Sequence, residues 1–243
     1  MWLSGFPVLD KTLAGGFRSG ELVLVGGGQG LGKTTFALQV MRNLVATGHT
    51  AVYFSFDHDN TTLIERLIAM EAAEIAGLSG VSLKRVREDT GQAPFVVVDS
   101  LQKVHLAGSG LLSEDDRATL VVDELKDLTL EADVPILAIV AAGPISGKRM
   151  RIKDLRGSSN VAVPADVVLI LNNKFDVVAR HHLVYNLASA ERFKSWVIMT
   201  IEKNRNGVDK VDLEFEKQFA QGRFDPNGGR VEEELLDDRI FVE

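Results

Sequence analysis

The stretch Gly27-Gly28-Gln29-Gly30-Leu31-Gly32-Lys33-Thr34 decides the fold class of this 243-residue chain. It follows the apolar run 21–25, which is typical of a buried strand, and precedes residues 34–45, whose apolar side chains recur at helical spacing. The eight residues fit the pattern G-x-x-x-x-G-K-[ST] at every position, between a strand and a helix. The alternative is a glycine-rich turn that matches by chance. The combination favours a loop that binds nucleotide phosphates.

Each residue type in this loop has a physical role toward phosphate. Glycines let backbone N–H groups turn inward, because a positive φ costs them little, and the helix N-terminus adds partial positive charge. We expect Lys33 to reach the β- and γ-phosphates and to be catalytic, and Thr34 to bind Mg²⁺. The predicted cofactors are ATP and Mg²⁺, and the predicted nucleotide-binding residues are Gly28, Gln29, Gly30, Leu31, Gly32, Lys33, Thr34 and Thr35.

Asp99 is the second candidate site residue, since it directly follows the apolar run Phe95–Val98. A carboxylate at the end of a buried strand beside a phosphate loop is placed to hold Mg²⁺ or its water. An aspartate after a strand is usually a turn former. The phosphate loop favours the metal role, so we expect Thr34 and Asp99 to share the ion.

Short β-branched runs alternate with amphipathic stretches along the chain, which predicts an α/β fold with a mostly parallel sheet and helices on both faces. Helices are expected over 34–45, from Thr62 and from Ser113, while 77–92 reads as a connector. Expected strands cover 21–25, 51–56, 95–98, 134–142 and 165–171, and an antiparallel hairpin joins Val197–Ile201 to Val211–Phe215 through Asn206-Gly207.

Composition excludes several classes of protein. The absence of cysteine rules out disulfide scaffolds, thiolate catalysis and cysteine-based zinc sites. No apolar run approaches the roughly 20 residues of a membrane span, and residues 1–7 lack a signal-peptide layout. We expect one cytoplasmic domain over 1–243, with an opening segment at 1–20 and a solvated acidic tail at 225–243. The net charge of −7 argues against a general nucleic-acid coat, but it allows a local basic patch.

Further motifs follow one another along the chain. They are residues 4–10 and 15–22 before the loop, 55–57, 98–102, 154–158, 165–168 and Lys203-Asn204-Arg205-Asn206-Gly207. In this order, and together with the loop, they resemble the RecA-like ATPase core of DnaB-type replicative helicases, and several of them are shared with RadA- and KaiC-like relatives. The resemblance runs from about residue 4 to about residue 224 and implies a RecA-like three-layer α/β/α fold with a C-terminal antiparallel hairpin.

The resemblance implies roles for residues far from the loop. Lys203 and Arg205 would act on the γ-phosphate of a neighbouring subunit in a ring, expected to be a hexamer; the alternative is a pair of surface cations on a hairpin. Asp57 stands where the family carries its catalytic glutamate, so we expect Asp57 to orient the attacking water, with Asp59 as a substitute. Asp is one methylene shorter, which predicts slower turnover. His58 reads as an exposed loop residue.

A basic segment at 147–156 is the candidate nucleic-acid site. By resemblance it would line a central pore and contact the phosphates of single-stranded DNA, without sequence specificity and with salt-dependent affinity. Nearby aromatic residues are missing, so backbone contact is favoured over base stacking. A solvated flexible loop is an almost equally good interpretation. The predicted contacts are Lys148, Arg149, Arg151, Lys153 and Arg156.

Three functional hypotheses follow. The first is a DnaB-like, DNA-dependent ATPase that acts as a helicase or translocase, favoured by the basic segment and by Lys203 and Arg205. The second is a RadA/KaiC-like regulatory or assembly ATPase, favoured by Ala141-Ala142, where DnaB-type proteins carry Ser-Gln, and by the lack of a counterpart to the family's N-terminal domain. The third is a weakly hydrolysing ATP-binding module, favoured by Asp57.

Overall fold

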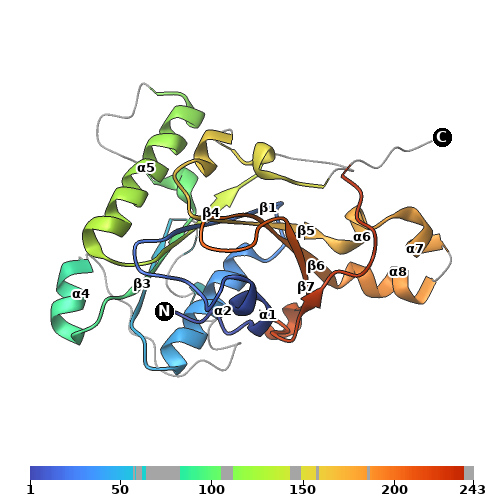
Figure 1. Ribbon diagram of the computed structural model, residues 1–243, viewed down its shortest axis with the longest axis horizontal. Coiled ribbons are helices and arrows are strands. Elements are labelled where there is room, and N and C mark those ends of the chain that lie inside the picture. The colour runs from blue at the N-terminus through green and yellow to red at the C-terminus, as the bar shows by residue number, and fades with distance from the viewer. Residues whose placement is uncertain are drawn as a thin grey trace.

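A mostly parallel sheet forms the centre of the protein (Figure 1). The computed structural model describes residues 1–56, 58, 62–63, 83–104, 112–142, 149–156, 159–184 and 187–237. Within these ranges the strands are β1 (Leu22–Gly27), β2 (Ala51–Ser55), β3 (Phe95–Asp99), β4 (Ile136–Ala141), β5 (Val167–Asn173), β6 (Trp196–Asn204), β7 (Val211–Gln218), β8 (Arg223–Phe224) and β9 (Gly229–Arg230).

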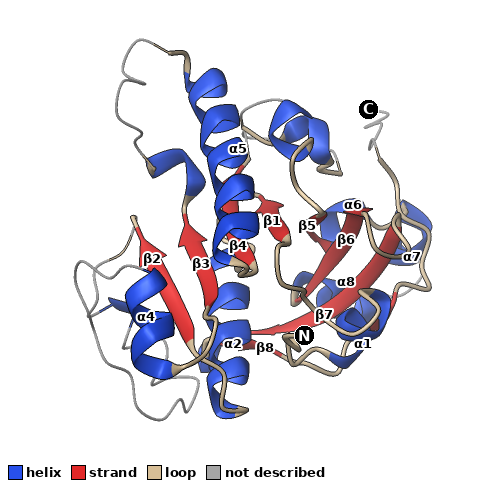
Figure 2. Ribbon diagram, turned by 60° about the vertical axis from the view of Figure 1, so that its left-hand side comes forward, coloured by secondary structure: helices blue, strands red, loops and turns tan. Residues whose placement is uncertain are grey.

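The strands follow the order β2-β3-β4-β1-β5-β6-β7-β8, with β9 beside β7. Figure 2 shows β2 and β3 at one side of the sheet and β6 and β7 at the other. Strands β2, β3, β4, β1 and β5 pair in parallel, whereas β6 runs antiparallel to both β5 and β7. The predicted α/β class, with its mostly parallel sheet and C-terminal antiparallel hairpin, is confirmed.

Alternating side chains of β1 face two separate cores, which is why helices cover both faces of the sheet. Val23 and Val25 pack with Phe36 and Leu44 of α2 (Lys33–Ala46). The next residues along the strand, Leu22 and Leu24, pack instead against α5 (Glu114–Ala132). The other α-helices within the described ranges are α1 (Pro7–Thr12), α4 (Leu83–Thr90), α6 (Lys174–Val177), α7 (Arg180–Val184) and α8 (Leu187–Lys194).

Local contacts explain where α5 begins and how far β1 extends. The Oγ of Ser113 accepts a hydrogen bond from Asp116 N at 3.1 Å and caps α5, as expected. The helix predicted from Thr62 lies mostly outside the described residues. Strand β1 continues two residues beyond Val25, because Gly26 fits between neighbouring side chains: a Cβ there would lie 2.3 Å from Leu155 Cδ2.

The connector predicted over 77–92 is wrong where the structure describes it, because 83–90 form α4. Leu83 packs against the core under α5, and this contact outweighs the high charge of the segment. Pairs four residues apart, Lys84–Glu88 and Arg85–Asp89, add a small contribution along the exposed face.

The acidic tail is not a solvated extension over residues 225–237. Strand β9 pairs with β7, and Leu235 forms a β-bridge with Val178. Lys174, which is 1% exposed, forms ion pairs with Glu214 and, at 2.7 Å, with Glu233 of the tail. The tail is docked because a buried ammonium needs carboxylate partners.

Residues 1–20 pack onto the same core as α2. Phe6, Leu9 and Phe17 are fully buried, and the carboxylate of Asp10 accepts hydrogen bonds from the backbone N and the hydroxyl of Ser4. In the described part of the chain, helices that combine bilayer-spanning length with an apolar composition are absent.

Candidate functional site

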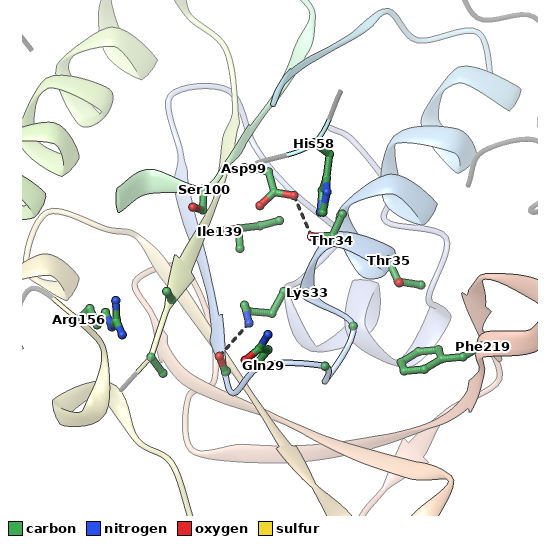
Figure 3. Close-up of a pocket in the computed structure, with 15 residues that line it drawn as sticks. Gln29, Lys33, Thr34, Thr35, His58, Asp99, Ser100, Ile139, Arg156 and Phe219 are labelled. Carbon is green, nitrogen blue, oxygen red and sulfur yellow. Dashed lines mark hydrogen bonds between the residues drawn. The ribbon is translucent and has the colours of Figure 1, made fainter. Parts of the chain in front are cut away.

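The predicted phosphate loop joins β1 to α2, so it lies at the carboxyl edge of the central strand (Figure 3). Gly30 and Gly32 have φ values of +75° and +91°, in the left-handed region that favours glycine. Gly32 is also restricted by space, since a Cβ there would lie 2.6 Å from the ring of Phe224. The glycines therefore match the geometry that the sequence predicts for this loop.

The Lys33 ammonium lies over the loop. Its Nζ donates hydrogen bonds to the carbonyl oxygens of Gly27 and Gly28, each at 2.9 Å. Burial lowers the pKa of Lys33 below its ordinary value of 10.5, while the Asp99 carboxylate acts in the opposite direction. A half-buried cation whose partners are two neutral carbonyls is poorly compensated, so an anion bound beside it would be stabilised.

Thr34 and Asp99 meet at the other side of Lys33. Thr34 Oγ1 donates a 2.8 Å hydrogen bond to Asp99 Oδ2, and the Tyr53 hydroxyl donates a 2.7 Å bond to the same oxygen. Asp99 is 2% exposed and ends β3, next to β4 in the sheet. One carboxylate and one hydroxyl are the oxygen donors that Mg²⁺ prefers, so these two residues fit the predicted ion.

A cavity of about 620 Å³ lies over the loop. Most of the predicted nucleotide-binding residues line it, namely Gln29, Gly30, Gly32, Lys33, Thr34 and Thr35. Gly28 contributes its carbonyl to Lys33, and Leu31 packs against the core under α2. Asp99 and Ala141 complete the wall beneath the ends of β3 and β4.

The cavity includes Phe219, which sequence reasoning missed. Its ring is 43% exposed and packs edge-on against Phe224, with 5.4 Å between centroids. The backbone of Phe224 is held by Gln39 of α2, through bonds of 2.8 Å and 2.9 Å. This pairing spans 185 residues of sequence, and the one local signal is a polar Gln39 on a buried helix face.

His58 also lines the cavity, next to Asp99 and Thr34 (Figure 3). Its backbone exchanges hydrogen bonds with the Ser55 hydroxyl at the end of β2. His58 was expected to be an exposed loop residue, but it lies on the wall of the cavity. Asp57 and Asp59, the predicted and substitute bases, lie outside the described residues.

Lys203 and Arg205 lie at the opposite end of the strands from the loop of their own chain. Lys203 pairs with Val168 near the start of β5, whereas the loop follows the end of β1. Lys203 Nζ donates to the carbonyls of Ala162 and Val163, each at 2.9 Å, and Arg205 donates to Asp166 Oδ1 at 3.1 Å. Burial lowers the pKa of Lys203, and so do Arg205 and Lys126, although Asp166 opposes them.

The five cations predicted to contact nucleic acid do not form one exposed group in the described residues. Arg149 is 7% exposed, donates to Thr200 Oγ1 at 2.9 Å and pairs with Asp212. Arg151 pairs with Glu202 at 2.7 Å and with Asp237 of the tail at 2.6 Å. Lys153 is exposed, Arg156 lies on the cavity wall, and Lys148 falls outside the described ranges.

Comparison with known proteins places these features in a family. The DnaB-like helicase C terminal domain family matches residues 3–86 and 74–224. The replicative DNA helicase DnaB of Treponema pallidum is 26% identical over 90% of this chain and 55% of that protein. The DNA repair protein RadA of Haemophilus influenzae is 31% identical over 59% of this chain and 31% of that protein.

A solved DnaB-like replicative helicase, described together with its interactions with primase, has the same fold. The TM-score is 0.74 at 20% identity, over 92% of this chain and 61% of that one. The chain spans about half the length of the curated DnaB helicases that it matches.

Proposed function

The chain belongs to the DnaB-like helicase C terminal domain family, and from this premise we propose that residues 1–243 form one Mg²⁺-dependent ATPase domain that drives movement on single-stranded DNA. The observation that carries the proposal is the cluster of Lys33, Thr34 and Asp99 around a glycine loop at the edge of the sheet. The adjoining cavity of about 620 Å³ falls within the usual range for small-molecule sites.

Each residue of the cluster has a distinct part in this mechanism. The loop N–H groups and the start of α2 hold the phosphate chain, and Lys33 neutralises its terminal end. Thr34 and Asp99 hold Mg²⁺, which supplies further charge neutralisation to the phosphate oxygens when bound. Phe219 offers its exposed ring to the base, at the side of the cavity beyond Thr35 (Figure 3).

Asp57 is proposed as the residue that orients the attacking water. It comes two residues after Ser55, where β2 ends, and β2 pairs with β3, which carries Asp99. Because parallel strands end at a common edge of a sheet, an aspartate that closely follows β2 is expected on the same edge as Asp99. Replacement of Asp57 by asparagine is expected to reduce turnover while nucleotide affinity stays within about threefold.

Lys203 and Arg205 are proposed to complete the site of a neighbouring subunit. Their position at the far end of β6 separates them from the phosphate loop of the same chain. Arg205 is 45% exposed at its side chain and so can reach a second subunit. A ring, proposed as a hexamer, would bring each pair to the next cavity, where a cation stabilises the transferring phosphoryl group.

For single-stranded DNA, Lys148 and Lys153 are the cations of the basic segment that stay proposed as phosphate contacts, whereas Arg156 lines the nucleotide cavity. Arg149 is enclosed by β6 and β7, and Arg151 is paired with the tail, so their contact with a strand needs rearrangement of those partners. DNA binding through few cations would have a shallow dependence on salt.

A regulatory or assembly ATPase of the RadA/KaiC kind is the second candidate. The end of β4 supports it, because Ala141 and Ala142 offer no polar side chain to link nucleotide state to a strand of DNA. A weakly hydrolysing ATP-binding module is the third candidate, supported by the short Asp57 side chain.

The test is steady-state ATP turnover against protein concentration, with and without a single-stranded oligonucleotide. The DNA motor predicts a rate per subunit that rises with assembly and rises again with oligonucleotide. A rate per subunit that rises with protein concentration but does not change when oligonucleotide is added supports the assembly ATPase instead. Nucleotide binding with negligible turnover in all conditions supports the binding module.

A further inference from the structure

The end of β4 lacks polar side chains where the cavity needs them. Ala141 pairs with Gly27 of the phosphate loop, and Ala141 and Ala142 both line the cavity beside Lys33. A methyl group cannot compensate the charge of a terminal phosphate. A polar contact on this side of the cavity comes from another segment of the chain or from a neighbouring subunit.

Arg156 is the residue that the fold brings to this position. Its backbone N donates a 3.1 Å hydrogen bond to Ala141 O, and the preceding Leu155 forms a β-bridge with Ala142. Leu155 is buried against Gly26 at the end of β1. The backbone that carries Arg156 is therefore fixed against both β1 and β4.

The Arg156 guanidinium is available for an anion. Among the residues that the structure describes, its ion-pair partner is Glu114 at 3.6 Å, which is too long for a hydrogen bond, and both side chains are at least half exposed. The two preceding arginines differ, because Arg149 and Arg151 are held by carboxylates at hydrogen-bond distance. Of these three arginines, Arg156 alone lines the cavity.

The cavity has a cationic and an aromatic end. Figure 3 shows Arg156 to one side of Lys33, with Thr35 and Phe219 on the other side. A nucleotide with its base near Phe219 would direct its terminal phosphate past Lys33 toward Arg156. Arginine suits this position because its planar fork donates two parallel hydrogen bonds to phosphate oxygens.

We propose that Arg156 binds the terminal phosphate of ATP in its own chain and so distinguishes ATP from ADP. The inference rests on the proposed ATP site and assigns a contact on the same chain, in addition to Arg205 from a neighbour. The Ala141 backbone N donates a 3.0 Å hydrogen bond to Oε1 of Gln102, which lies in the 3-10 helix (Leu101–Lys103) that follows Asp99. Ala141 thus bonds to Arg156 through its carbonyl and to the segment after Asp99 through its N–H.

The experiment is calorimetric titration of the full chain with a slowly hydrolysed ATP analogue and with ADP, both with Mg²⁺. Arg156→Gln is expected to lower the affinity for the triphosphate by about tenfold to a hundredfold, because a charge-assisted contact is lost. Its affinity for ADP should stay within about twofold of the parent's. Arg156→Lys keeps the charge and restores part of the preference. Arg192→Gln, which removes an exposed arginine of α8, is the matched control. It should keep the parent's ratio of triphosphate affinity to ADP affinity.

The outcomes separate the two proposals. If the parent binds neither nucleotide, the ATP site itself is wrong and the inference falls with it. If the parent prefers the triphosphate and Arg156→Gln keeps that preference, the inference alone is overturned. If Arg156→Gln loses affinity for single-stranded DNA but keeps the parent's ratio of triphosphate to ADP affinity, Arg156 is a DNA contact. That result would also overturn the inference.

Discussion

Thr34 Oγ1 and Asp99 Oδ2 lie 2.8 Å apart, although 65 residues separate them in sequence. The hydrogen bond joins the first turn of α2 to the end of β3, and thus connects the phosphate loop with the neighbouring strand end of the sheet. The contact places a hydroxyl and a buried carboxylate side by side, with Lys33 close enough for its pKa to respond to Asp99. The account of Mg²⁺ binding depends on this pair.

Asp99→Asn should therefore affect nucleotide binding only when magnesium is present. Loss of the charged ligand is expected to lower the affinity for Mg·ATP by about tenfold to a hundredfold. With a chelator present, the affinity for ATP should stay the same or increase, because a negative charge near the phosphates is removed. Titration calorimetry under both conditions measures the effect.

Tyr53→Phe is the control for this variant. It removes the second hydrogen bond to Asp99 Oδ2 but keeps the carboxylate, so affinity for Mg·ATP should change by less than about threefold. Equal losses for Asp99→Asn with and without magnesium would show that Asp99 supports the loop and does not hold the metal.

The lowered pKa of Lys33 predicts a pH dependence of nucleotide affinity. Because burial shifts this pKa below 10.5, part of the lysine loses its proton as the pH rises toward that value. Affinity for Mg·ATP should then fall by up to about tenfold per pH unit above the folded-state pKa. The free protein should gain stability over the same window, since the unfolded chain binds the proton more tightly than the folded one.

Lys33→Arg provides the comparison, because a guanidinium keeps its charge throughout this range. Its affinity can be lower than the parent's, but it should not change with pH between neutrality and 10. Parallel pH profiles for Lys33→Arg and the parent would exclude Lys33 as the titrating group.

The position of Lys203 and Arg205 predicts that active sites are shared between subunits. Lys33→Ala and Arg205→Ala should each be inactive alone, because the first removes the phosphate contact and the second removes the neighbour's cation. In a one-to-one mixture, random assembly leaves about a quarter of the sites intact, so about a quarter of the parent's turnover should return. Turnover is measured after mixing and re-equilibration of the subunits.

Lys126→Ala is the matched control for Arg205→Ala. Both side chains pair with Asp166, but Lys126 lies on α5, and its replacement leaves the Arg205 side chain present for the neighbour. Lys126→Ala should retain most of the turnover. If mixing restores none of the activity, the shared site is excluded.

The docked tail predicts an effect of Glu233 on stability. Burial raises the pKa of Glu233, but the hydrogen bond and charge of Lys174 outweigh it, so the pKa lies below the ordinary 4.5. Glu233→Gln should lower the free energy of unfolding at pH 7 by about 1–2 kcal/mol. The difference should vanish as the pH falls below 4.5, since the protonated carboxyl no longer pairs with Lys174.

Glu232→Gln serves as the reference in urea unfolding, because Glu232 is the exposed neighbour in the same tail. It should match the parent within about 0.5 kcal/mol. Equal effects of the two substitutions would mean that the Lys174 contact adds nothing to stability.

The sequence was sufficient to predict features set by local pattern. The loop from Gly27 to Thr34 has its own spacing signature, and Asp99 could be placed beside it because parallel strands end at a common edge. The hairpin around Asn206-Gly207 was likewise predicted, since a turn signal separated two β-rich runs.

Features that depend on packing between distant segments could not be predicted. The contact between Gln39 and Phe224 brings Phe219 to the cavity, and Lys174 captures the tail through Glu233. Neither pairing leaves a periodic signal in the chain. The charge of α4 concealed a helix for the same reason, because the contact of Leu83 with the core under α5 exists only in the folded protein.

The most direct measurement is calorimetric titration of Mg·ATP into the parent and into Lys33→Ala. The account predicts saturable binding to the parent at one site per chain, and an affinity weakened by about a hundredfold or more when the ammonium that contacts Gly27 and Gly28 is removed. Binding of equal strength by the two proteins, or no heat of binding for the parent, would contradict it.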